Sequence, residues 1–243
     1  ERYARLFAAR TSVMRSSAMR DLMEITARPD VISLAGGLPD TSTFPPESFA
    51  ARMTRIAYES TEEALQYGPT EGFTETKECI LEVMAAEGMH PDIDDVTVTT
   101  GGQQAIDLIA KTLVDPGDPV ICEAPTYPGA VPVFSSYQAE VHQIEMDEDG
   151  MRIDLLEEQL EQLAAEGRRP KFIYAIPNFQ NPAGVTLSLE RRRRLVEIAR
   201  EQKLLIAFPG QFASDNFIIK WGDQFVLDPV DASVIAAALE VAW

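Results

Sequence analysis

Three short segments of this sequence combine glycine, proline and neutral polar residues in a way that could bind a small molecule. They are TTGGQQA (99–105), EAPTYPG (123–129) and IPNFQNPAG (176–184), and each follows a run that is typical of a strand. The last segment contains two asparagines, a glutamine and two prolines, which is more polar chemistry than a turn requires. Each segment is suited to a different part of one ligand.

The first segment is suited to a phosphate group. Gly101 and Gly102 let backbone amides approach an anion, and Gln103 begins a predicted helix whose first N–H groups have no partner within the helix. The segment is neither a Walker A loop nor a GxGxxG turn. A plain tight turn between a strand and a helix is the alternative interpretation.

The other two segments are suited to a flat ring with an oxygen substituent. Tyr127 lies between two prolines, where its ring could stack on a planar ligand, or could simply pack under a loop. Asn178 and Asn181 could donate to a phenolate oxygen without adding charge, with an Asx turn as the alternative. A planar, phosphorylated ring such as pyridoxal phosphate satisfies all three segments.

The elements that must position these segments alternate between strands and helices from residue 96 onward. Strands are predicted over 96–99, 119–122, 141–145, 171–176 and 204–207, and helices over 103–113, 130–137, 155–164 and 188–202, with Ser188 as an N-cap. This alternation predicts an α/β fold, a three-layer sandwich with a mainly parallel sheet. Such sheets bind ligands beyond the carboxyl ends of their strands, where the segments lie.

Three regions are expected along the chain. Residues 1–60 are an N-terminal arm with helices, 61–210 are the cofactor-binding domain, and 211–243 are an atypical tail. Helices before residue 96 are predicted over 17–27, 47–63 and 74–88.

The composition narrows the class of protein. The net charge of −18 over 243 residues disfavours nucleic-acid binding. The excess of acid and the scarcity of lysine fit a halophile's cytosol or an ordinary acidic enzyme. Two distant cysteines, Cys79 and Cys122, indicate neither a disulfide framework nor a zinc site, so no metal is expected. With no long apolar run and no signal peptide, a cytoplasmic protein without a membrane partner is expected.

In their order and spacing, the three segments resemble the large domain of fold-type I pyridoxal-phosphate-dependent aminotransferases of class I/II. SSAMRDLMEITARPDVISLAGGLPDTSTFP (16–45) and LQYGPTEGF (65–73) resemble the branch of 2-aminoadipate and multi-substrate aminotransferases, which also supplies the effector domain of MocR-type regulators. The resemblance covers about residues 5–206. It implies pyridoxal 5′-phosphate as the cofactor, an amino acid and a 2-oxo acid as substrates, and a homodimer.

The resemblance also implies roles for single residues in holding the cofactor. The backbone of Gly101, Gly102 and Gln103 binds the phosphate, and Tyr127 stacks on the pyridine ring. Asn181 holds the 3′ oxygen, with Asn178 close by.

Further roles concern the substrate and a second subunit. Tyr67 reaches the phosphate of the neighbouring subunit's cofactor, and Gly37 lines the substrate pocket. Arg20 meets an acidic substrate side chain, with a solvated charge on a helix face as the alternative.

The region after residue 206 departs from the family pattern. Where the family has an Asp and a Tyr after the strand, this chain has AFPGQ (207–211), and it has no Ser-x-x-Lys segment. Lys220 is the one candidate for the catalytic lysine, with a solvent-facing strand lysine as the alternative, and the small C-terminal domain is expected to be missing or truncated. The expected function is transamination; the alternative is an inactive, truncated or remodelled module that binds only phosphate or cofactor.

Overall fold

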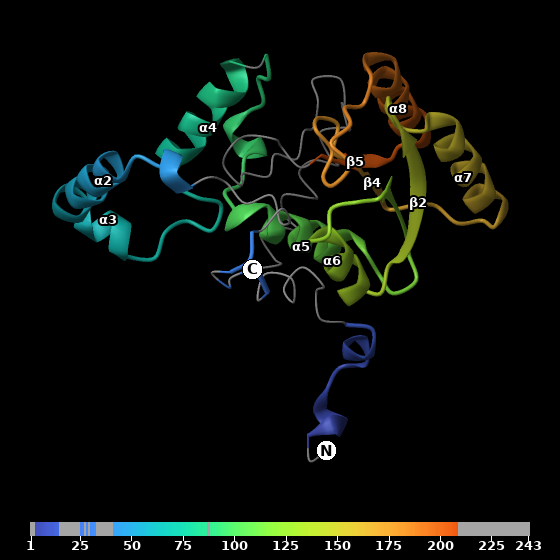
Figure 1. Cartoon of the computed structure of the whole chain (residues 1–243), viewed down its shortest axis with the longest axis horizontal. Coiled ribbons are helices and arrows are strands. Elements are labelled where there is room, and N and C mark those ends of the chain that lie inside the picture. The colour runs from blue at the N-terminus through green and yellow to red at the C-terminus, as the bar shows by residue number, and fades with distance from the viewer. Residues whose placement is uncertain are drawn as a thin grey trace.

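The computed structural model describes residues 3–14, 25–26, 28, 30–32, 41–86 and 88–208 (Figure 1). A five-stranded sheet has the order β3-β2-β1-β4-β5. The parallel strands are β1 (Pro119–Ala124), β2 (Glu140–Asp147), β4 (Phe172–Tyr174) and β5 (Leu205–Ala207). Only β3 (Gly150–Met151) pairs antiparallel, with β2. The predicted α/β fold with a mainly parallel sheet is confirmed.

Helices cover both faces of the sheet, because successive side chains of a strand point to opposite faces. Residues such as Cys122 and Tyr174 pack against α5 (Gly101–Leu113) and α6 (Ala130–Ser136). Residues such as Ile121 and Ile173 pack against α7 (Ile153–Ala165) and α8 (Leu189–Gln202), which lie side by side in Figure 1. The result is the predicted three-layer sandwich.

The core is apolar on both faces of the sheet. On the α6 side, the ring of Phe134 meets Phe172 and Tyr174 edge-on, with centroids 5.7 and 5.6 Å apart. On the α7 side, Leu156 and Leu195 are fully buried. Burial of strands on both faces is what a parallel sheet between helices requires.

The described residues before α5 are mostly helical. It contains η1 (Ala4–Leu6), η2 (Ala9–Ser12), η3 (Thr41–Thr43), α2 (Pro46–Glu59), α3 (Thr61–Leu65), α4 (Thr74–Ala86) and η4 (Ile93–Asp95). The helix predicted over 47–63 is two helices, because Ser60 leaves the helical conformation with φ −132° and ψ 36°. The helix predicted over 74–88 is confirmed as α4. Of the helix predicted over 17–27, only residues 25 and 26 are described, and both are helical.

The prediction of a strand over 96–99 is wrong. The alternation of valine and threonine is typical of a strand, but these residues join no strand of the sheet. The Val98 N–H instead donates to the Glu71 carbonyl at 2.8 Å. The Val98 side chain also contacts Gly72 closely, since a Cβ added to Gly72 would lie 2.4 Å from Val98 Cγ2. The segment therefore packs on the loop before α4 rather than on a strand.

The other predicted elements between residues 100 and 207 are present with shifted ends. Ser188 occupies the N-cap position of α8, as predicted, although its side chain makes no capping hydrogen bond. No helix in the part of the chain that the structure describes is long and apolar enough to cross a membrane.

Candidate functional site

The candidate site lies at the carboxyl ends of β1 and β4, which are neighbours in the sheet. β1 leads into the EAPTYPG loop and β4 into the IPNFQNPAG loop, and Cys122 pairs with Tyr174 across the two strands. Because parallel strands end at the same edge of a sheet, both loops emerge there. The first segment, TTGGQQA, leads into the first turn of α5, which packs on the face that carries Cys122 and Tyr174.

The first turn of α5 has backbone N–H groups that no described side chain caps. Gly101 has a φ of +73°, a left-handed conformation that favours glycine. Thr100 occupies the N-cap without a side-chain hydrogen bond to the turn, and its N–H donates to the Gln104 side chain. Among the described residues no side chain caps the N–H groups of Gly102 and Gln103. These donors and the positive end of the helix dipole could bind a phosphate.

Gly129 joins this turn to the aromatic ring of the second loop. Its carbonyl accepts a hydrogen bond from Gln103 Nε2 at 2.8 Å. A Cβ on Gly129 would lie 2.5 Å from Tyr127 Cε1 and 2.7 Å from Gln103 Oε1. Only glycine leaves room for this arrangement, which brings the half-buried Tyr127 ring beside the open end of α5.

The two asparagines of the IPNFQNPAG loop have different surroundings. Arg192 of α8 donates to the Asn178 side-chain carbonyl, to the Pro177 carbonyl at 2.7 Å and to the Leu187 carbonyl at 2.6 Å. Asn178 thereby anchors its own loop to α8. Asn181 is exposed, and its side chain makes no hydrogen bond to any described residue, so its amide is available to a ligand.

Two buried polar side chains between the loops were missed by sequence reasoning. Glu123 is 1% exposed, and its Oε2 accepts from the Ile176 N–H and from Gln180 Nε2, both at 3.0 Å. The same Gln180 nitrogen donates to the Pro125 carbonyl at 2.8 Å. The signal that could have revealed Glu123 is an acid that directly follows a fully apolar strand.

Burial sets the protonation of this carboxyl group. Burial raises the pKa of Glu123 to about 7, although the hydrogen bonds from Gln180 and Ile176 act in the opposite direction. Burial also raises the pKa of the neighbouring Cys122 thiol to about 12, so this cysteine is a neutral core residue.

Tyr67 lies on the loop between α3 and α4. Its side chain is 99% exposed on the loop after α3, and its N–H donates to the Gln66 side chain at 2.9 Å. Figure 1 shows α2 and α3 at the opposite end of the molecule from α7 and α8. Within the part of the chain that the structure describes, no hydrogen bond connects Tyr67 to the other predicted site residues.

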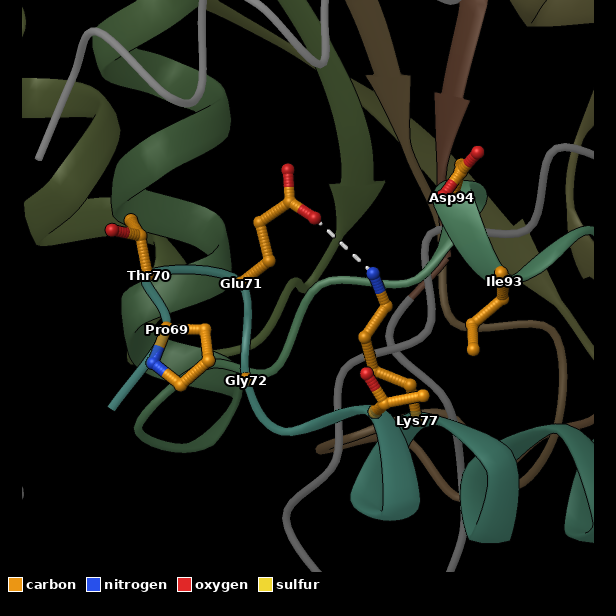
Figure 2. Close-up of a pocket in the computed structure, with 8 residues that line it drawn as sticks. Pro69, Thr70, Glu71, Gly72, Lys77, Ile93 and Asp94 are labelled. Atoms are coloured by element: carbon orange, nitrogen blue, oxygen red, sulfur yellow. Dashed lines mark hydrogen bonds and ion pairs between the residues drawn. The ribbon is translucent and has the colours of Figure 1, made fainter. Parts of the chain in front are cut away.

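A cavity of about 560 Å³ lies under the loop that follows Tyr67. Figure 2 shows the Lys77 side chain reaching from α4 to the Glu71 carboxylate, at 3.1 Å. Lys77 is 6% exposed, whereas the Glu71 side chain is 34% exposed, so only the lysine end of this ion pair is buried. The pair fixes the loop to α4; the cavity lining is Pro69, Thr70, Glu71, Gly72, Thr74, Lys77, Ile93 and Asp94.

Three of the predicted site residues lie outside the described residues. They are Arg20 and Gly37, predicted for the substrate pocket, and Lys220, predicted as the catalytic lysine.

Comparison with known proteins gives a consistent result. The family model for aminotransferase class I and II matches residues 29–208. The aromatic-amino-acid aminotransferase 1 of Thermococcus litoralis is 42% identical over 210 residues, which are 84% of this chain and 49% of that protein. The chain therefore spans about half the length of this curated relative.

Solved structures of aminotransferases share the fold. The multiple substrate aminotransferase from Thermococcus profundus superposes with a TM-score of 0.83 at 33% identity, over 100% of this chain and 66% of that one. The α-aminoadipate aminotransferase from Thermus thermophilus, complexed with N-(5′-phosphopyridoxyl)-L-leucine, gives a TM-score of 0.74 at 35% identity. That match covers 85% of this chain and 49% of the other.

The residues at the strand ends fit a phosphopyridoxyl group. The open turn of α5 offers donors to a phosphate, and the space that a Cβ on Gly129 would fill is kept for the Tyr127 ring. Asn181, which directly follows the buried Gln180, offers a neutral amide to the same ligand.

Proposed function

The chain belongs to the class I and II aminotransferases, and we propose that it supports the transfer of an amino group from an amino acid to a 2-oxo acid with pyridoxal 5′-phosphate as cofactor. The observation that carries this proposal is the junction at Gly129, where the open end of α5 meets the Tyr127 ring. A phosphorylated pyridine requires N–H groups that donate to its phosphate directly beside an aromatic ring that stacks on it.

Each residue of the site has a proposed task. The N–H groups of Gly102 and Gln103 hold the phosphate, with Gly101 giving the turn its shape. Tyr127 stacks on the ring and excludes water from that side, and the Asn181 amide donates to the ring oxygen. When bound, the cofactor supplies an electron sink for the bonds at the substrate α-carbon.

Lys220 is the proposed lysine that binds the cofactor covalently and moves the proton at the substrate α-carbon. We test this with borohydride reduction of the protein mixed with pyridoxal phosphate, followed by peptide mapping. Cofactor fixed on Lys220, and absent from a Lys220→Ala variant, supports the role. Cofactor that is still fixed elsewhere in Lys220→Ala contradicts it.

A cofactor-binding module without transamination is the second candidate. The observation that favours it is the sequence after β5, where AFPGQ replaces the acidic residue that tunes the pyridine nitrogen in the family. Binding of pyridoxal phosphate that inorganic phosphate displaces, together with no lysine fixed by borohydride and no amino transfer, would identify the chain as such a module.

Substrate preference is proposed from the N-terminal arm. Arg20 binds an acidic substrate side chain, and the backbone at Gly37 lines the pocket. An Arg20→Gln variant is expected to raise the KM for a dicarboxylic amino acid about tenfold and to leave the KM for an aromatic one unchanged. Equal changes for both donors would place Arg20 outside the pocket.

We propose a homodimer in which Tyr67 reaches the phosphate site of the partner subunit. Support comes from the full exposure of Tyr67 and from the apolar side chains of Phe49, Met53 and Ile56, which are 59%, 69% and 45% exposed on α2. Sedimentation equilibrium tests the assembly. A dimer whose cofactor affinity falls in Tyr67→Phe supports it, and a monomer with full cofactor affinity contradicts it.

The protein is proposed to act in the cytoplasm. A salt-rich cytoplasm would screen the self-repulsion that its net charge of −18 causes.

A further inference from the structure

We propose that Glu123 and Gln180 are a positioning pair that fixes the loop bearing Tyr127 relative to the loop bearing Asn181. The pair touches neither substrate nor cofactor in this assignment. The inference rests on the proposed function, since it concerns the same cofactor site, and it adds the residues that set the spacing between the aromatic ring and the amide.

The pair acts where the sheet ends. β1 and β4 are paired up to Cys122 and Tyr174, and beyond these residues β4 ends while β1 continues to Ala124 beside β2. The Glu123 carboxylate accepts the Ile176 N–H at 3.0 Å and so replaces the backbone acceptor that a longer strand would provide. Glu123 thereby extends the connection of the two strands by one hydrogen bond.

Gln180 completes the connection from the other side. Its Nε2 donates to Glu123 Oε2 at 3.0 Å and to the Pro125 carbonyl at 2.8 Å, so a single nitrogen holds two points of the EAPTYPG segment. Pro125 lies two residues before Tyr127, which makes the position of the ring depend on this amide.

Gln180 is equally fixed within its own loop. Its Oε1 accepts the Ala183 N–H at 2.8 Å, and its backbone N–H donates to the Val185 carbonyl at 2.7 Å. Gln180 is 2% exposed whereas the next residue, Asn181, is exposed. Because the side chain of Gln180 is held inward, the adjacent Asn181 is turned outward to the ligand side.

Among the described residues, no cation pairs with Glu123 in place of Gln180. The ionisable groups that influence or are influenced by Glu123 are Cys122 on the same strand and Tyr174 on β4. No ion pair to Glu123 is present among the described residues. An acid buried without a cationic partner costs free energy that fold stability alone does not require, which argues for a task at the site.

Pyridoxine 5′-phosphate tests the proposal, because it lacks the aldehyde and its binding reports only on the loops. Two variants of the full chain are compared with wild type. Gln180→Met keeps the side-chain length and removes the amide. Glu123→Gln keeps an oxygen that can accept from the Ile176 N–H and from Gln180 Nε2. Leu156→Ala is the control, since Leu156 is a fully buried apolar residue of α7 that belongs to neither loop. Binding affinity, circular dichroism of the bound ring and Tm are measured for each.

Gln180→Met is expected to weaken binding about tenfold and to change the dichroism of the bound ring, because one hydrogen-bonded tie between the loops is lost. Glu123→Gln is expected to bind within about threefold of wild type with unchanged dichroism. Leu156→Ala is expected to lower Tm and to leave both binding readouts unchanged.

Three results would overturn the proposal. A folded Gln180→Met protein with wild-type affinity and dichroism shows that the pair does not position the ring. If Gln180→Met does not fold, Glu123→Met replaces it with the same expectations, and failure of both to fold shows a role in stability alone. If the wild-type chain does not bind pyridoxine 5′-phosphate, the proposed function fails first and the positioning role fails with it.

Discussion

Gly129 lies where the Tyr127 ring and the Gln103 side chain meet, and a methyl group at this position has no room. A Gly129→Ala substitution is expected to displace the ring and to weaken pyridoxal phosphate binding about tenfold, or about 1.4 kcal/mol. Equilibrium titration followed by absorbance measures the change.

Gly167→Ala serves as the control for Gly129→Ala. Its Cβ would meet nothing within 4 Å, but its φ of +70° makes alanine strained. It should lower the free energy of unfolding by about 1 kcal/mol without changing cofactor affinity. Equal affinities for the two variants would contradict a close junction at Gly129.

The Glu123 carboxyl group provides a pH test at the same scale. Its pKa in the folded protein is raised to about 7, above the ordinary value of 4.5, so the folded state holds the proton more tightly than the unfolded state. The stability from this group is complete below pH 4.5 and is lost as the pH rises to about 7. Glu123→Gln has no such loss, and between about pH 4.5 and about pH 8 its free energy of unfolding should gain about 3 kcal/mol relative to wild type.

Denaturant unfolding of both proteins across this pH range measures the difference. All other titrating groups are common to the two proteins, so their contributions cancel. Parallel pH profiles would show that Glu123 ionises normally in the folded state.

At the scale of elements, the Arg192 side chain connects the loop of residues 177–187 to α8 by hydrogen bonds. The Arg192 guanidinium donates to two backbone carbonyls and to the Asn178 amide. An Arg192→Met substitution is expected to destabilise the fold by about 2 kcal/mol and to weaken cofactor binding, because the loop that bears Asn181 loses its anchor. Chemical denaturation and cofactor titration check both effects.

Arg193→Met is the matched control for Arg192→Met. Arg193 is the next residue on α8 and is exposed. Its loss should change stability by less than about 0.5 kcal/mol and leave cofactor affinity unaltered. If Arg192→Met changed stability and cofactor affinity as little as Arg193→Met does, the loop would have to be held by other contacts.

The elements also show what sequence reasoning could and could not predict. The strands and helices after residue 100 follow from short apolar runs that alternate along the chain with helical segments, since a parallel sheet buried between helices imposes that pattern. The strand predicted over 96–99 was wrong because its alternation reflects packing on Glu71 and Gly72 rather than strand pairing. Glu123 and Gln180 were missed because they lie 57 residues apart, and only the register of β1 with β4 brings them together.

At the scale of the whole molecule, the charge of −18 opposes compactness through repulsion between acidic side chains. Sodium chloride screens this repulsion, since the Debye length falls from about 10 Å at 0.1 M to about 3 Å at 1 M. The Tm is therefore expected to rise by several degrees, roughly 5 °C, over that range. Differential scanning calorimetry measures it, and a Tm that falls with added salt would mean that attractive ion pairs outweigh the net repulsion.

The central claim is that the open turn of α5 and the two loops beside it form a pyridoxal phosphate site. The most direct measurement is an equilibrium titration of the wild-type chain and a Gly102→Asp variant with pyridoxal 5′-phosphate, with inorganic phosphate as competitor. Saturable binding to the wild type that phosphate displaces, and that a negative charge at position 102 lowers at least about tenfold, is the predicted result. Equal binding by both proteins, or binding that phosphate does not displace, would contradict a phosphate cradle at the start of α5.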